Sequence, residues 1–315
     1  MNPRIVNPRR TKPRTAARPA ASGAHDADTF DAAYARVLAD WPHSRTATTV
    51  ATPFGATHVN TCGPADGAPV VLLPGGGGAT SASWAAQAVT LSRTHRVHAV
   101  DLVGFPGRSV PAADRPVRTL DDLLAWLTAV LDGLGLGAGP DHRPVDLIGH
   151  SYGAWIALHH TLRTPSGVRR LVLLDPTRCF AGFRPEYLLH AAPLLVRPTR
   201  RRVRAFLEWE TGGAIGRDPD CLALEQAAAR FPAARPASGP RPAADALRAL
   251  DVPTLLLLGG ASRTHDAERV AARARAVMPH VTAHVLPGTP HHAMPRLLPA
   301  GAQQLMADFL IPGTP

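Results

Sequence analysis

One short segment constrains this chain more than any other: an apolar run, a Gly-x-Ser-x-Gly turn and a second apolar run. Residues 145–149 suit a buried strand and residues 152–164 a helix, with Gly149, Ser151 and Gly153 between them. A turn that joins a strand directly to a helix strains the backbone of its central residue and exposes that side chain above the sheet. Glycines are needed beside it because side chains there would collide with the strand and the helix. The segment therefore predicts a nucleophilic serine at Ser151.

Composition agrees with a globular protein. The hydrophobic share of 45% is ample for a core, and 315 residues allow one large domain with an insertion. No apolar run approaches the roughly 18 residues of a membrane span, so we expect no integral membrane association and a cytoplasmic location. The three cysteines match no metal-binding spacing, and their odd number argues against a disulfide framework.

The net charge of +10 is concentrated at the N-terminus. Residues 1–25 carry five arginines, one lysine and no acid, so they supply six of the ten charges. This segment is rich in proline and lacks apolar periodicity, which predicts a disordered basic tail. No apolar stretch follows the twin arginine Arg9-Arg10, which argues against a secretory signal. We therefore expect no nucleic-acid partner, and weak attachment to an anionic surface is the alternative reading of the tail.

The rest of the chain alternates between short apolar segments and amphipathic ones. Strands are expected near residues 69–73, 96–101, 145–149, 168–174, 254–259 and 281–286. Helices are expected over about residues 28–41, 83–91, 119–134, 152–164, 267–278 and 300–310. This alternation predicts the α/β class, with a mostly parallel sheet and helices on both of its faces. A hairpin signal over residues 45–62 adds an antiparallel pair.

The order of these segments resembles the α/β-hydrolase superfamily over about residues 45–311. Residues 70–78 (Val-Val-Leu-Leu-Pro-Gly-Gly-Gly-Gly) are similar to the family's third strand and oxyanion loop. Residues 96–109 resemble the next strand and its Asp-x-x-Gly-x-Gly-x-Ser turn, with one residue inserted. The strands that follow the nucleophile also have counterparts, at residues 168–176, 253–259 and 286–291.

Residues 177–250 interrupt the alternation of strands and helices. They hold helical stretches with prolines and many arginines, but no strand of the core type. The resemblance implies that this insertion is a helical cap over the active site. The α/β-hydrolase core would then comprise residues 26–176 and 251–315, preceded by the tail of residues 1–25.

Hydrolysis with a serine nucleophile needs a base, because a free hydroxyl is a poor nucleophile near neutral pH. The resemblance implies His291, in the turn after the last strand, as that base, with the adjacent His292 as the alternative. The resemblance also implies an oxyanion hole made of backbone N–H groups. Tyr152, directly after the nucleophile, would give one N–H group, and Gly76 or Gly77 the other.

The glycine loop departs from the family pattern at one position. Pro74 stands where the family usually has a histidine that braces this loop. We therefore expect the loop to be held in a different way.

The acid that orients the histidine is left open by the sequence. The family's usual position corresponds to Ser262, which is not a carboxylate. Asp266, slightly later in the same loop, is the first candidate, although it would also serve as the N-cap of the helix over residues 267–278. Asp175, at the end of the preceding strand, is the alternative acid. A third possibility is that no functional acid exists.

The resemblance implies a serine hydrolase of the carboxylesterase type (EC 3.1.1) that acts on a small-molecule acyl ester and needs no cofactor and no metal. A thioesterase or a lactonase would use the same residues. A small-molecule binding protein with an incomplete triad, on the same fold, is an alternative of another class. The oligomeric state is not fixed by the sequence.

Overall fold

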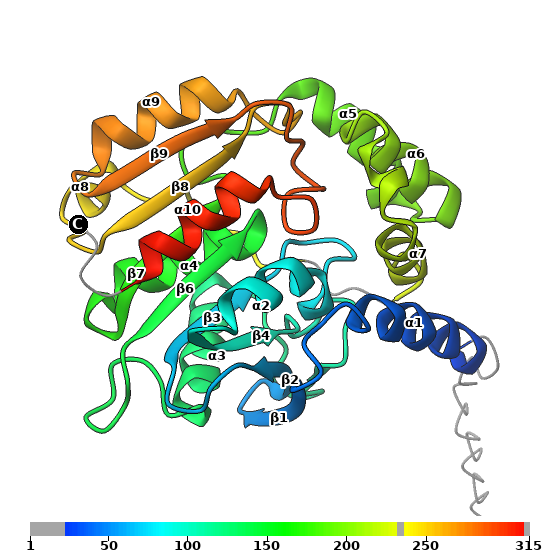
Figure 1. The fold of residues 1–315 in the computed structure, drawn as a ribbon. Coiled ribbons are helices and arrows are strands. Elements are labelled where there is room, and N and C mark those ends of the chain that lie inside the picture. Colours follow the sequence, from blue (N-terminus) through cyan, green and yellow to red (C-terminus); the bar gives the residue numbers. More distant parts are fainter. Residues whose placement is uncertain (1–22, 232–235, 312–315) are drawn as a thin grey trace, which may run out of the picture.

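A computed structural model describes residues 23–231 and 236–311. A mostly parallel β-sheet forms its centre, and helices pack against both faces of this sheet (Figure 1). This arrangement confirms the α/β class that the sequence predicts.

Within the described residues the sheet has nine strands. They are β1 (Thr46–Thr52), β2 (Gly55–Cys62), β3 (Ala68–Leu73), β4 (His95–Val100), β5 (Val110–Pro111), β6 (Val145–His150), β7 (Val168–Leu174), β8 (Thr254–Gly259) and β9 (Val281–Leu286). Their order is β1-β2-β4-β3-β6-β7-β8-β9, and β5 pairs with β2. The pairs of β2 with β1, β4 and β5 are antiparallel, and the other pairs are parallel. The predicted strands and the hairpin are therefore all present.

Ten α-helices lie within the described residues. The α-helices are α1 (Gly23–Leu38), α2 (Ala85–Leu91), α3 (Leu120–Gly133), α4 (Tyr152–Arg163), α5 (Pro185–Val196), α6 (Arg200–Glu210), α7 (Pro219–Ala228), α8 (Ala244–Arg248), α9 (Ala267–Val277) and α10 (Ala300–Leu310). Short 3₁₀ helices are η1 (Ser81–Trp84), η2 (Pro165–Gly167) and η3 (Ala214–Arg217).

The sheet separates two apolar cores. One contains Trp126 of α3 and Trp155 of α4, and the other contains Trp84 of η1 and Met306 of α10. Strands β3, β6 and β8 are buried on both faces, which explains why they read as continuous apolar runs rather than as alternating patterns.

Helix α1 differs from its predicted bounds at both ends. It begins at Gly23, so residues 23–25, which were assigned to the tail, are helical. The other residues of the predicted tail, 1–22, lie outside the described residues. The helix ends before Trp41. Pro42 follows Trp41, and the helical conformation is unfavourable for a residue that precedes proline. The large apolar side chains of the predicted range 28–41 are nevertheless buried: Phe30, Tyr34, Val37, Leu38 and Trp41.

The segment predicted as a cap contains four α-helices and no strand among its described residues. Helices α5, α6 and α7 lie together beyond one edge of the core (Figure 1), and apolar side chains of α6 and α7 share a small core of their own. Helix α8 instead contacts α9, and its Leu247 belongs to the main core. Helix α7 also packs on α1 and adds Leu224, Ala227 and Ala228 to the core that contains Trp84, so α5 and α6 are the helices of this segment that lie farthest from the sheet.

The Asp101 carboxylate organises the turn after β4. It accepts hydrogen bonds from the backbone N–H of Ser81 (2.8 Å), from the backbone N–H of Arg108 (2.7 Å) and from the hydroxyl of Tyr34 (3.1 Å). Asp101 is fully buried, so these donors replace the water that it loses on folding. The turn brings Phe105 to the wall of the cavity described below.

We expect Asp101→Asn to destabilise the fold by about 1–3 kcal/mol, because the amide nitrogen must face one of two backbone N–H donors and leave it unpaired. Urea denaturation followed by circular dichroism measures this change. Asp114→Asn, at an exposed position in the next loop, is the control and should leave the free energy of unfolding unchanged. Equal stability of both variants would contradict the role given to Asp101.

Candidate active site

Ser151 occupies the turn between β6 and α4 in a conformation that side chains rarely adopt, with φ of 53°. Its backbone N–H donates to the carbonyl of Leu174 at 2.9 Å. A Cβ on Gly149 would lie 2.4 Å from the carbonyl oxygen of Gly153, and a Cβ on Gly153 would lie 2.2 Å from that of Leu73. Both glycines of the motif are therefore required by packing, and the strained turn presents the serine hydroxyl at the end of the sheet.

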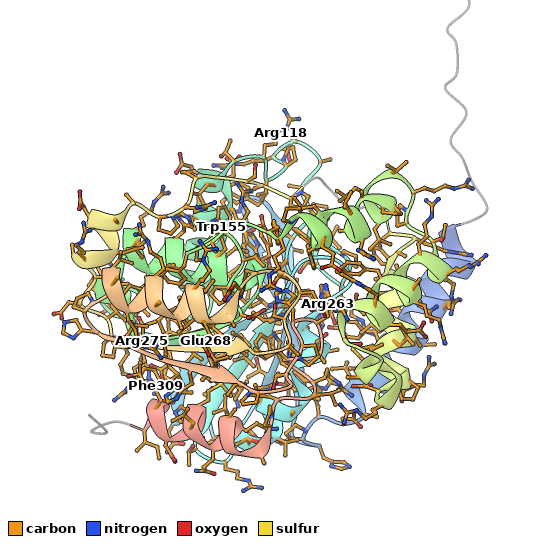
Figure 2. The ribbon with its side chains drawn as sticks, turned by 90° about the horizontal axis from the view of Figure 1, so that it is seen from above. Arg118, Trp155, Arg263, Glu268, Arg275 and Phe309 are labelled. Atoms are coloured by element: carbon orange, nitrogen blue, oxygen red, sulfur yellow. The ribbon has the colours of Figure 1, made fainter. Side chains whose placement is uncertain are left out.

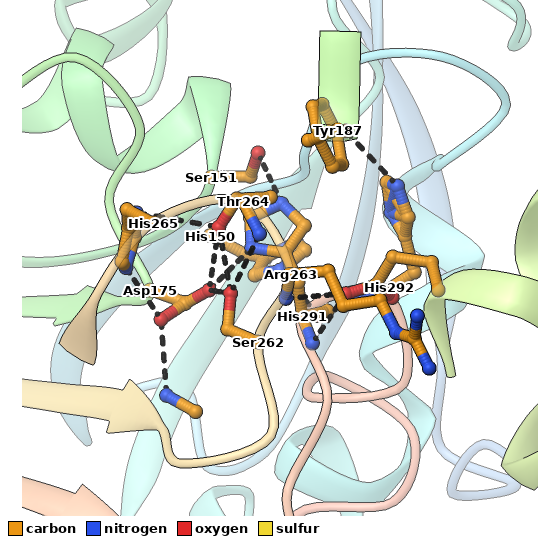
Figure 3. Close-up of polar contacts among 12 residues, drawn as sticks. His150, Ser151, Asp175, Tyr187, Ser262, Arg263, Thr264, His265, His291 and His292 are labelled. Carbon is orange, nitrogen blue, oxygen red and sulfur yellow. Dashed lines mark hydrogen bonds and ion pairs between the residues drawn. The ribbon is translucent and has the colours of Figure 1, made fainter. Parts of the chain in front are cut away.

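Three side chains from distant parts of the chain form one hydrogen-bonded series (Figure 3). His291 Nε2 lies 2.8 Å from Ser151 Oγ, and His291 Nδ1 lies 2.5 Å from Asp175 Oδ2. His291 and Asp175 are fully buried, and Ser151 is 8% exposed. Ser151 and Asp175 follow adjacent parallel strands, β6 and β7, which places them at the same edge of the sheet.

The carboxylate of Asp175 receives several further hydrogen bonds. Oδ1 accepts from the backbone N–H of Gly259 at 3.0 Å and lies 3.0 Å from His265 Nε2. Oδ2 accepts from the hydroxyl of Ser262 at 2.7 Å. Burial alone would raise the pKa of Asp175, but the charges and hydrogen bonds of His265 and His291 hold it well below its ordinary value. Asp175 is therefore an anion at neutral pH.

The structure does not bring Asp266, the first candidate acid, to His291. Asp266 is the N-cap of α9: its Oδ1 accepts from the backbone N–H of Arg269 at 3.1 Å, and its Oδ2 lies 3.8 Å from Arg184. Its side chain is 45% exposed. The loop before α9 is drawn toward Asp175 by its neighbour His265, which leaves Asp266 facing outward. The prediction that Asp266 reaches the histidine is wrong, and the alternative, Asp175, occupies that place.

Sequence reasoning missed His265, one of thirteen histidines to which it gave no special role. Ser262 and His265 both contact Asp175, so the loop after β8 supplies donors to the acid rather than the acid itself. The signal was present in part, because the family's usual acid position holds Ser262, a hydrogen-bond donor.

The other two histidines of the region differ from His291 in their contacts. His292, the alternative base, has its Nε2 3.3 Å from the hydroxyl of Tyr187 (Figure 3). His150, at a variable position of the Gly-x-Ser-x-Gly motif, has its Nε2 3.0 Å from the carbonyl oxygen of His291. Burial, with the charge of His291, lowers the pKa of His150 well below its ordinary value, so this ring is neutral and donates to that carbonyl.

The predicted oxyanion residues lie together beside the serine. A Cβ on Gly76 would lie 3.7 Å from Tyr152 Cβ, and a Cβ on Gly75 would lie 3.4 Å from Ser151 Cβ. Tyr152 is the first residue of α4, where backbone N–H groups have no partner within the helix. Gly77 adopts a positive φ of 79° in the same loop.

A cavity of about 540 Å³ opens above Ser151. Its floor includes Ser151 and the glycine loop, and helices α5, α6 and α7, which lie in the segment predicted as a cap and are called the cap helices below, form much of its wall. The cap contributes mostly apolar side chains: Ala191, Leu194, Val203, Phe206, Leu207 and Cys221. Figure 2 shows the cap helices beside the core when the molecule is viewed from above.

Metal and membrane features are not found in the part of the chain that the structure describes. No group of three His, Cys, Asp or Glu side chains there is arranged to hold a metal ion. Among the same residues, no helix has the length and apolar character needed to cross a bilayer.

Comparison with known proteins is consistent with this geometry. A model of the alpha/beta hydrolase family matches residues 70–301. The chain belongs to this family. A relative in the curated proteins, the carboxylesterase YbfK of Bacillus subtilis (strain 168), is 29% identical over 271 residues, which cover 83% of this chain and 87% of the relative.

Solved structures of this alpha/beta hydrolase's relatives extend the similarity. The crystal structure of carboxylesterase CesB (YbfK) from Bacillus subtilis has a TM-score of 0.83 at 27% identity and covers 92% of this chain and 100% of that chain. The naproxen esterase (carboxylesterase NP) from Bacillus subtilis has a TM-score of 0.82 at 27% identity and covers 91% and 98%. The relatives support a hydrolase of the carboxylesterase type.

We expect Gly153→Ala to prevent formation of the turn, because its Cβ would lie 2.2 Å and 2.4 Å from the carbonyl oxygens of Leu73 and Pro74. Soluble yield and the thermal melting temperature measure the effect. Gly301→Ala is the matched control, since no atom lies within 4 Å of its added Cβ, and alanine in helix α10 should raise stability by about 0.5–1 kcal/mol. A Gly153→Ala protein that melts like the parent would contradict the packing argument.

Proposed function

We propose that this protein cleaves carboxylic esters through an acyl-enzyme on Ser151, with His291 as general base and Asp175 as the acid. The observation that carries the proposal is the continuous series Ser151 Oγ–His291–Asp175, with contacts of 2.8 Å and 2.5 Å, below an apolar cavity. The similarity to carboxylesterases supports an ester as the substrate.

The reaction follows from these positions. His291 Nε2 accepts the hydroxyl proton of Ser151 as Ser151 Oγ attacks the acyl carbon of the ester. The resulting imidazolium of His291 then gives that proton to the departing alcohol. A water molecule, which gives its proton to the same nitrogen, attacks the acyl-enzyme, and the carboxylic acid product leaves Ser151. The anionic Asp175 holds the proton on Nδ1 and stabilises the imidazolium in both halves of the reaction.

The tetrahedral oxyanion needs hydrogen-bond donors that are in place before the reaction. We assign the backbone N–H of Tyr152 and that of Gly76, with Gly77 as the alternative to Gly76. The close approach of Gly76 to Tyr152, 3.7 Å from its Cβ to that of Tyr152, supports this pairing.

The cap defines what enters the site. We propose that α5, α6 and α7 select the acyl or alcohol group by contact with their apolar side chains, such as Leu194, Phe206 and Leu207. An uncharged, mostly apolar ester fits this part of the wall best, because these three side chains offer a charged group nothing in place of its hydration.

Three alternative functions are a thioesterase, a lactonase and a small-molecule binding protein. Thioesters and lactones would be cleaved by the same residues, so relative kcat/KM values on oxygen esters, thioesters and lactones separate these classes. A binding protein with an incomplete triad was the alternative of another class. The contact between Asp175 and His291 weighs against it, since that reading requires the acid to be absent.

We expect Ser151→Ala to abolish hydrolysis of p-nitrophenyl esters and labelling by a fluorophosphonate probe, with the melting temperature of the parent retained. Ser238→Ala is the control, because Ser238 also lines the cavity but is exposed and lies on another segment. Undiminished turnover by Ser151→Ala would refute the assignment of the nucleophile.

Two aspartate variants test the acid. We expect Asp175→Asn to lower kcat by about 10³–10⁴ with little change in KM, because the histidine loses both its orienting partner and the charge that stabilises the imidazolium. Asp266→Ala should leave kcat unchanged and cost about 1 kcal/mol of stability, since it removes an N-cap. The reverse pattern, a slow Asp266→Ala enzyme and an active Asp175→Asn enzyme, would restore Asp266 as the acid.

A further inference from the structure

Two carboxylates from the cap reach the backbone of two loops of the core. Glu210 is the last residue of α6, and Glu225 lies within α7. One contacts the loop that carries His291, and the other contacts the glycine loop at Gly78. Both loops supply groups to the proposed reaction, so the contacts link the cap to the chemistry.

Glu210 holds the histidine loop with both of its oxygens. Its Oε1 accepts from the backbone N–H of His291 at 3.2 Å, and its Oε2 accepts from the backbone N–H of His292 at 3.0 Å. Oε1 also lies 3.5 Å from the backbone nitrogen of Arg263, in the loop after β8. Glu210 is 1% exposed, so these N–H groups replace its hydration. One side chain of the cap thus binds two consecutive backbone N–H groups, those of His291 and His292.

Glu225 makes the corresponding contact with the glycine loop. Helix α7 packs so closely here that a Cβ on Gly78 would lie 2.4 Å from Glu225 Oε2. Burial raises the pKa of Glu225 to about 7, and the N–H of Gly78 opposes this rise. The loop carries Pro74 in place of the bracing histidine expected from the family, and Glu225 gives it a brace from the cap instead.

We propose that Glu210 and Glu225 are positioning residues, through which the cap helices α6 and α7 hold the histidine loop and the glycine loop in the geometry of the reaction. The packing of the cap helices on these two loops then determines whether the site has the geometry that hydrolysis needs. This proposal rests on the proposed function for its kinetic consequences, but the contacts themselves can be tested without turnover.

The amide analogue of each residue tests the contact with the least change in shape. The two oxygens of Glu210 face two N–H donors, so glutamine at this position must place its own donor group against one of them. That amide loses its partner, and the loop loses half of its attachment. Glu208→Gln is the matched control: it removes the same charge from the same helix, but Glu208 is exposed and pairs with Arg204.

The pH dependence distinguishes positioning from simple packing. Burial lowers the pKa of His291, but the hydrogen bond and charge of Asp175, and then the charge of Glu210, raise it above its ordinary value. The other titratable rings that face it, His150 and His292, remain in the variant. Loss of the Glu210 charge therefore lowers the pKa of His291. Because the base acts in its neutral form, the acidic limb of the kcat/KM profile moves to lower pH.

Hydrogen exchange of the full chain, followed by mass spectrometry, tests the contacts directly. We expect Glu210→Gln to speed exchange in peptides spanning residues 288–294 by about tenfold or more, and Glu225→Gln to do so in peptides spanning residues 75–79. Neither variant should affect the other segment to the same extent, and Glu208→Gln should affect neither. Unchanged exchange in both segments, or an equal rise in all three variants, would overturn the proposal.

Ester hydrolysis by the same variants supplies the second readout. We expect kcat to fall by up to about 10²-fold in Glu210→Gln and Glu225→Gln, with a smaller change in KM, because small displacements of reacting groups are costly. The acidic limb should move only in Glu210→Gln. Parent-like kcat in both variants would also overturn the proposal. If the parent protein shows no esterase activity but the exchange pattern holds, the proposed function fails while the attachment of the loops to the cap stands.

Discussion

The buried charge of Asp175 is the constraint on which the active-site end of the molecule depends. A carboxylate with no exposed surface is costly unless donors surround it. The donors come from separate segments: the end of β8 at Gly259, the following loop at Ser262 and His265, and the loop after β9 at His291. To satisfy one charge, these segments must converge on the end of β7, which fixes the path of both loops.

Backbone strain collects at the same edge of the sheet. Ser151 and Asp175 both have positive φ, 53° and 41°, directly after adjacent strands. Such conformations persist only where the surroundings determine them. Here the N–H of Ser151 donates to Leu174 and the N–H of Asp175 donates to Leu257, so each strained residue is tied to the neighbouring strand. The sheet therefore holds Ser151 and Asp175 at a fixed separation, and His291 reaches both of them from the loop after β9.

Whether a feature could be predicted from the sequence depended on how far apart along the chain its interacting residues lie. The turn at Ser151 was predictable because its glycines are required by contacts within a few residues and with one adjacent strand. The acid was not, since Asp175 and Asp266 both have a good local explanation, and the contact that separates them joins residues 116 positions apart. Glu210 had no signal at all: it is one of two acids in an arginine-rich helix, and its partners are backbone amides, which leave no trace in composition.

The loop after β8 brings a second imidazole, that of His265, against Asp175. His265 Nε2–H can donate to Asp175, and its Nδ1 lies 3.2 Å from the hydroxyl of Thr264, which can donate in return. Both nitrogens of His265 therefore have hydrogen-bond partners. On its other side the Asp175 carboxylate lies 2.5 Å from Nδ1 of His291, the ring that becomes an imidazolium in the proposed reaction. Of the two imidazoles beside the acid, His291 contacts Ser151, and His265 helps to orient the carboxylate.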